Sequence, residues 1–93
     1  MAYKVRTSQR DITANTTINP SNFGGWLIVN NGTTGNVYVD GYKLEPGDGL
    51  NMTDLHPDVI WDQPIRVIID SGAIARFTSL RYTEVKKEDK ERG

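Results

Sequence analysis

The sequence predicts an all-β protein: a single small antiparallel β-sandwich, jelly-roll-like, with flexible N- and C-terminal segments. Short stretches of apolar or alternating apolar and polar residues recur along the chain, and Gly, Pro, Asn and Asp separate them. No stretch shows the three-to-four-residue apolar spacing of an amphipathic helix. The 93 residues suffice for one domain with a modest core, and not for two.

The stretch from Trp26 to Leu50 carries the clearest strand and turn signals. Apolar runs predict three short strands that form one compact antiparallel unit, at residues 26–29, 36–39 and 42–44. Asp40 and Gly41 predict a tight hairpin turn of type I′, since both central positions of that turn need positive φ. The turn pairs the residues on either side of it, Tyr38 and Val39 with Tyr42 and Lys43. After the third strand, Pro46 ends the ladder in a second turn.

Other apolar runs and period-2 alternation predict the remaining strands, at residues 3–8 (a short strand or an extended arm), 11–18, 59–61, 65–70 and 74–83. Between the last two, Gly72 suits the left-handed position of a short hairpin loop. The final strand changes its apolar phase near Thr78 and Ser79, where we expect a β-bulge.

The predicted core consists of apolar side chains on the inner faces of these strands: Ile12, Ile18, Trp26, Ile28, Val37, Val39, Leu44, Ile60, Ile65, Val67, Ile69 and Phe77. The chain divides into an extended N-terminal arm at residues 1–10, a β-sandwich domain at 11–85 and a charged tail at 86–93. The tail has no apolar residue, so we expect it to be disordered.

The net charge of −1 is unevenly distributed. Lys4, Arg6 and Arg10 give the first ten residues a charge of +3, whereas residues 11–85 carry −5. Because the body would repel a phosphate backbone, we expect no nucleic-acid binding. The N-terminal cations are either a contact for an acidic partner or a solvated end. No apolar run is long enough to cross a bilayer, no secretory signal is evident, and the chain has no cysteine.

No motif predicts catalysis, a cofactor or a metal. His56, the single histidine, could join Asp54 and Asp58 at a divalent cation, but a histidine in a loop beside proline is more often solvated. The chain has no nucleophile elbow and no EF-hand, P-loop or dinucleotide-binding spacing. Aspartates recur at predicted turns, where this side chain bonds to backbone amides.

Three aromatic residues are candidates for an interface. Tyr38 and Tyr42 are predicted to project from the outer face of the hairpin, and Trp61 lies in a short apolar run. Exposed aromatic rings fill subunit interfaces or stack on sugars, although ordinary cross-strand pairing explains them equally well. With Lys4, Arg6 and Arg10, they complete the set of candidate interface residues.

The pattern of strands and turns at residues 28–50 (IVNNGTTGNVYVDGYKLEPGDGL), 64–72 (PIRVIIDSG) and 81–83 (RYT) resembles small virion proteins of tailed bacteriophages, of the head-fibre and capsid-decoration type. The resemblance implies a β-sandwich with a non-enzymatic, structural role. It also implies a homotrimer that binds other virion proteins, such as the major capsid protein, in a particle assembled in the host cytoplasm. The alternatives are a carbohydrate-binding β-sandwich module, using Tyr38, Tyr42 or Trp61, and a small cupin-like enzyme, which a single histidine disfavours.

Overall fold

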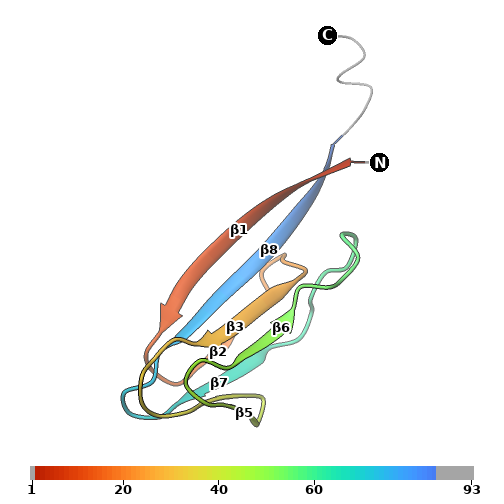
Figure 1. Cartoon of the computed structure of the whole chain (residues 1–93). Helices are drawn as coiled ribbons and strands as arrows, with labels where there is room; N and C mark the ends of the chain where they lie inside the picture. Colours follow the sequence, from red (N-terminus) through yellow and green to blue (C-terminus); the bar gives the residue numbers. More distant parts are fainter. Residues whose placement is uncertain (1, 86–93) are drawn as a thin grey trace.

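The computed structural model describes residues 2–85, which form two four-stranded antiparallel sheets (Figure 1). The strands are β1 (Ala2–Ile12), β2 (Thr16–Ile18), β3 (Trp26–Asn30), β4 (Val37–Val39), β5 (Tyr42–Leu44), β6 (Gly49–Met52), β7 (Ile65–Ile69) and β8 (Ala75–Val85). Within this part of the chain there is no helix that could span a membrane. The predicted tail at 86–93 lies outside the described residues.

The strand order identifies the sandwich as a jelly roll. One sheet has the order β1-β8-β3-β6 and the other β2-β7-β4-β5. Consecutive strands therefore lie in different sheets, except β4 and β5, which form a hairpin, so two interleaved Greek keys result. This arrangement confirms the predicted all-β sandwich.

The hairpin between β4 and β5 has the predicted turn and pairing. Asp40 and Gly41 have φ of 51° and 86°, as a type I′ turn requires. Tyr38 lies opposite Lys43. The prediction of one three-stranded unit was wrong, because β3 lies in the other sheet, between β6 and β8. An apolar run identifies a strand but does not reveal its neighbours.

The turn before β8 illustrates the same limit. Gly72 has φ of 87°, as predicted, and the Ala73 amide donates to the Asp70 carbonyl over 3.0 Å. The turn does not close a hairpin, however, because it carries the chain from β7 in one sheet to β8 in the other. Each crossing between sheets places the inner faces of consecutive strands against each other across the core.

The core contains the predicted side chains with two exceptions. Ile69 is half-buried against the core, and Ile60 is 62% exposed. Ile60 was misplaced because residues 59–61 form no strand. They lie in a loop from which only Trp61 turns inward, packing edge-on against Trp26 at 5.2 Å between ring centroids. Further buried residues join the core: Phe23, Ala73 and Ala75.

Two further strand predictions need correction. The alternation over residues 11–18 is interrupted, because β1 ends at Ile12 and a turn precedes β2; Asn15 anchors this turn by accepting from the Ile69 amide over 2.8 Å. The expected bulge is absent, since Thr78 and Ser79 continue the β1–β8 register without a break. The apolar phase changes in β8 because both of its faces are partly covered, with Leu80 lying against Gly25 opposite the core.

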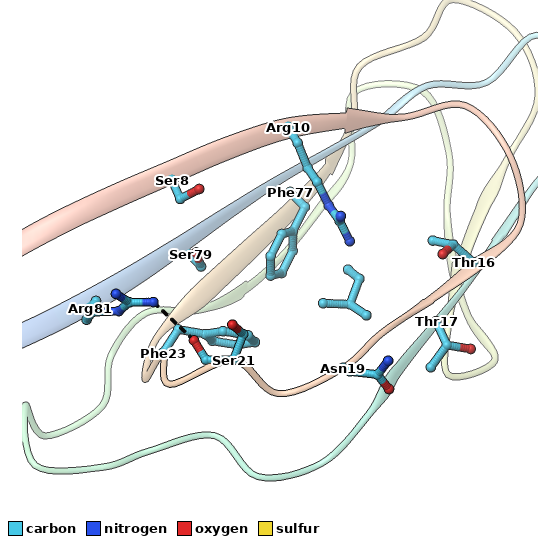
Figure 2. A pocket seen from close by; sticks show the side chains of 11 residues that line it. Ser8, Arg10, Thr16, Thr17, Asn19, Ser21, Phe23, Phe77, Ser79 and Arg81 are labelled. Atoms are coloured by element: carbon cyan, nitrogen blue, oxygen red, sulfur yellow. Dashed lines mark hydrogen bonds between the residues drawn. The ribbon is translucent and has the colours of Figure 1, made fainter.

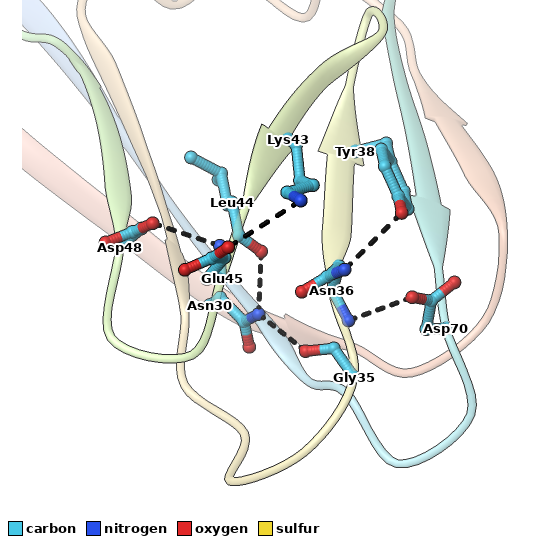
Figure 3. Close-up of polar contacts among 9 residues, drawn as sticks. All are labelled: Asn30, Gly35, Asn36, Tyr38, Lys43, Leu44, Glu45, Asp48 and Asp70. Carbon is cyan, nitrogen blue, oxygen red and sulfur yellow. Dashed lines mark hydrogen bonds and ion pairs between the residues drawn. The ribbon is translucent and has the colours of Figure 1, made fainter.

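A fully buried polar side chain joins the two sheets (Figure 3). Asn30, at the end of β3, donates through Nδ2 to the carbonyl of Leu44 in β5 over 2.9 Å and to that of Gly35 over 3.1 Å. Its Oδ1 accepts from the Gly32 amide over 3.1 Å. These bonds give hydrogen-bond partners to backbone groups at the end of β5 and in the loop after β3.

The β1–β8 pair extends beyond the sandwich (Figure 1). β3 pairs with β8 only as far as Ser79. Residues 2–6 and 81–85 therefore have no strand partners but each other in the described chain, and we call them the ribbon. Within the arm expected at residues 1–10, residues 2–6 form one strand of this ribbon, and residues 7–10 continue in β1 as far as Ile12.

Candidate functional site: a basic groove on the ribbon

One face of β1 changes character where it leaves the sandwich. Successive side chains on a strand alternate between faces, so Lys4, Arg6, Ser8 and Arg10 share the face that buries Ile12 in the core. At the core end this face carries the apolar Ile12, whereas along the rest of β1 it carries a serine and cationic side chains. The candidate site lies at this transition.

Below this face the two sheets separate and leave an open cavity of about 370 Å³ (Figure 2). Its lining residues belong to β1, to β8 and to the segment from β2 to Phe23, and many of them carry hydroxyl groups. They are Ser8, Arg10, Thr16, Thr17, Ile18, Asn19, Ser21, Phe23, Phe77, Ser79 and Arg81. An adjoining hollow of about 250 Å³ shares four of these residues and adds Arg6 and Thr7. We call the two together the basic groove; none of its lining residues is acidic.

The arginines of the groove differ in how firmly they are held. Arg81 donates from Nε to the carbonyl of Asn22 over 3.1 Å and from Nη2 to that of Ser21 over 3.2 Å, which fixes the loop beside the groove. The Arg10 guanidinium lies 6.0 Å from the centre of the Phe77 ring. Arg6 is exposed and makes no ion pair with the described residues. Guanidinium groups so placed offer forked donors to carboxylate or other oxyanions.

The opposite face of the ribbon carries two tyrosines, Tyr3 and Tyr82, together with Val5 and Glu84. Val5, which is 54% exposed, lies directly across from Tyr82. A hollow of about 180 Å³ places Tyr82 beside the loop residues Val59 and Ile60, which are 40% and 62% exposed. We call Val5, Tyr82, Val59 and Ile60 the apolar patch. A contiguous group of exposed apolar side chains typically marks a contact with another chain.

A hydrogen bond holds this loop against the ribbon. The hydroxyl of Tyr3 donates to Oδ1 of Asp58 over 2.8 Å. The bond, and the charge of the carboxylate, raise the pKa of Tyr3, because a phenolate there would lose the bond and face a like charge. The loop and the ribbon therefore present one surface.

The structure places the predicted interface residues in separate groups. Lys4, Arg6 and Arg10 lie in one row on β1, and Arg81 of β8 lies opposite Arg6. Sequence reasoning missed Arg81, since only the β1–β8 register brings it beside the N-terminal segment. The odd–even spacing of the three N-terminal cations was the available signal for a common face.

The three predicted aromatic residues do not form a platform. Tyr38 lies on the outer face of the hairpin, half-buried. Tyr42 lies opposite Val39 and hence on the inner face, so its predicted outward direction was wrong; it is exposed because it lies at the end of the hairpin. Trp61 packs on Trp26, and its Nε1 donates to the Gln63 carbonyl over 2.8 Å.

His56 and several aspartates hydrogen-bond to backbone amides. Nδ1 of His56 accepts from the Asp58 amide over 3.1 Å. Residues 2–85 contain no group of three or more His, Asp and Glu side chains placed to hold a metal ion. Asp48 accepts from the Glu45 amide over 3.1 Å, the local bond expected of a turn residue. Asp40 and Asp70 instead accept from the amides of Arg66 and Asn36, each over 3.0 Å, which are distant in sequence.

The groove and the patch lie on opposite faces of the β1–β8 pair: the groove runs beside the sandwich and reaches the ribbon at Arg6 and Arg81, and the patch lies on the other face of the ribbon. Hydroxyl, amide and guanidinium donors equip the groove for anionic side chains, and the patch suits apolar burial. The chain matches no known protein-family model, no curated protein and no solved structure.

Proposed function

We propose that this protein is a non-enzymatic structural component of a bacteriophage particle, a homotrimeric head-fibre or capsid-decoration protein. The ribbon is the observation that carries the proposal. An isolated two-stranded ribbon is at best marginally stable in water, and this one projects from the sandwich with exposed side chains on both faces. Such an element gains stability when other protein chains cover it.

The fold is compatible with this role, and the exposed ribbon supports it. Jelly rolls occur in viral capsid proteins, lectins and cupins, so the fold alone does not select a function. A sugar platform needs neighbouring exposed aromatic rings, and the placement of Tyr38, Tyr42 and Trp61 gives that alternative no support. The resemblance of the turn pattern to small virion proteins favours the particle.

The apolar patch is the surface we assign to self-association. Its four side chains come from both strands of the ribbon and from one loop, so a neighbouring copy would cover the ribbon and the loop together. Cyclic symmetry closes such contacts into a ring and leaves no copy with an uncovered patch. The virion resemblance favours three-fold symmetry.

Two substitutions of matched exposure test this assignment. Ile60, in the patch, is 62% exposed, and Tyr42, at the far end of the hairpin, is 59% exposed. Sedimentation velocity should show that Ile60→Asp dissociates the trimer at micromolar concentration, because a carboxylate would be buried against a neighbour. Tyr42→Asp should leave it intact. Dissociation by Tyr42→Asp alone would place the interface at the hairpin instead.

The particle assignment has its own test. Phage particles purified from infected cultures should contain the protein at a constant ratio to the capsid protein, measured by quantitative mass spectrometry. Antibody labelling should place it on the particle surface in electron micrographs. Recovery of the protein only from the particle-free fraction would contradict the proposal.

A further inference from the structure

The outer edge of β1 is long, and no strand within residues 2–85 covers it. β1 is the edge strand of its sheet, has 11 residues and pairs only with β8 among the described residues. Its residues from Lys4 to Asp11 are all exposed. Edge strands carry unpaired backbone N–H and C=O groups that accept an added strand, and proteins usually keep such edges short or protect them with charge. On one face of β1, the charged side chains that protect this edge are all cations.

The charges determine which strand fits. Lys4, Arg6 and Arg10 lie on one face of β1, and Arg6 and Arg10 line the basic groove. If the β1 edges of two copies paired, cations would face cations, and like charges across a strand pair are destabilising. The nearest carboxylate on this strand, Asp11, lies on the other face and bonds to Arg76 over 3.0 Å. The edge therefore disfavours its own copy and favours an acidic strand.

We propose that the outer edge of β1 binds an extended acidic segment of a partner protein by strand addition. Asp or Glu at alternate positions of that segment faces the cations of the groove, and apolar or β-branched residues at the intervening positions lie beside Val5 and Thr7. Main-chain hydrogen bonds supply affinity, and the alternating side chains supply specificity. The inference deepens the proposed function, on which it rests, by naming the chemistry of the partner.

A peptide is favoured over a nucleic acid on two observations. The unpaired edge offers backbone hydrogen bonds that match another polypeptide strand, with side chains on one face repeating about every 6.6 Å. Residues 11–85 carry a net charge of −5, which repels an extended phosphate backbone beyond the groove.

Synthetic peptides test the proposal on the full-length chain. Calorimetry would compare a capped peptide of about nine residues in which Glu alternates with Val, a length typical of a strand, with the same peptide carrying Lys for Glu. A third peptide keeps Glu but is N-methylated at alternate residues, which removes backbone donors. The Glu peptide should bind about tenfold more tightly than either control, from three opposite-charge pairs and the added ladder.

Charge reversal supplies the matching test on the protein. Arg6→Glu combined with Arg10→Glu should weaken binding of the Glu peptide about tenfold and confer binding of the Lys peptide. Arg66→Glu, on an exposed position of β7 in the other sheet, should change neither affinity. Circular dichroism of each variant checks folding, and the comparison of peptides on the parent chain stands even if the double variant unfolds.

Three results would overturn the inference: equal binding of the Glu and Lys peptides, no effect of N-methylation, or tighter binding of a polythymidine oligonucleotide than of the Glu peptide. The experiment is independent of the particle. If the peptide does not bind but the protein is found in particles, the strand-addition inference is wrong and the proposed function stands. If the peptide binds but the protein is absent from particles, only the proposed function is contradicted.

Discussion

At the scale of single residues, Asn30 shows how one polar side chain can join two sheets. It is fully buried, yet its side-chain amide bonds to three backbone groups, one in β5 and two in the loop after β3. The hydrophobic pattern marks the same position only as the end of an apolar run, before Asn31. A buried amide is recognised from its partners, which come from β5 and from the loop after β3, and alternation along one strand does not reveal them.

Replacing this amide should be costly. Asn30→Ala leaves the Leu44 carbonyl and its neighbours without partners inside the protein, so we expect a loss of about 2–4 kcal/mol in the free energy of unfolding. Asn31→Ala, at the exposed neighbouring position, should change it by less than about 0.5 kcal/mol. Urea denaturation of both variants measures the difference, and equal stabilities would contradict the buried role of Asn30.

Substitutions at two glycines can distinguish the cost of backbone strain from the cost of a steric clash. Gly41 and Gly35 both have left-handed φ, of 86° and 82°. A Cβ on Gly41 would meet no atom within 4 Å, whereas one on Gly35 would lie 2.8 Å from the Ser71 carbonyl oxygen. We expect Gly41→Ala to cost about 1 kcal/mol from strain alone.

Gly35→Ala should cost about 1–3 kcal/mol more than Gly41→Ala, because the loops must also move apart. Thermal unfolding monitored by circular dichroism gives both values. Equal unfolding temperatures for the two variants would show that the loops containing Gly35 and Ser71 do not approach each other closely.

At the scale of strands and loops, patterns local to the chain were predictable and pairing was not. The Asp40-Gly41 turn determines its own pairing, because its two strands are adjacent in sequence. The run at 59–61 has strand-forming residues but forms no ladder with a strand; its Trp61 amide donates to the carbonyl of Phe23, which also lies in a loop, over 2.8 Å. The sequence did not predict β6, because its Gly and Asn residues weaken the strand signal. The strand forms because it pairs with β3.

The contact between the ribbon and the loop at 53–61 has a measurable signature. The carboxylate of Asp58 raises the pKa of Tyr3 from its ordinary value of 10.0. In the folded chain the hydroxyl keeps its proton at a pH where the unfolded chain has lost it. The stabilisation from this contact is therefore complete below about pH 10 and is lost as the pH rises through the raised pKa.

Asp58→Asn removes the negative charge and should lower the pKa of Tyr3 toward its ordinary value, as followed by the ring resonances in an NMR titration. Asp54→Asn removes a carboxylate from the same loop that does not bond to Tyr3, and serves as the control. An unchanged titration of Tyr3 in the Asp58→Asn variant would show that the loop does not hold the ribbon in solution.

At the scale of the whole molecule, the sequence identified part of the site and the topology completed it. Lys4, Arg6 and Arg10 stand out as a basic segment, and their spacing indicates one face. Arg81 and the hydroxyl groups of the cavity come from residues 16–21 and 79–81, which only the jelly-roll order brings beside the N-terminal strand. The apolar patch was unpredictable for the same reason, since it joins both ends of the chain to a loop.

The central claim is that the chain acts as a homotrimeric structural module, and its molar mass in solution tests this most directly. Multi-angle light scattering on the full-length protein at micromolar concentration should give about 31 kDa, three times the 10.4 kDa of one chain. The proposed function predicts that result, because a closed trimer would cover the patch on every copy. A species of 10.4 kDa under the same conditions would contradict the account.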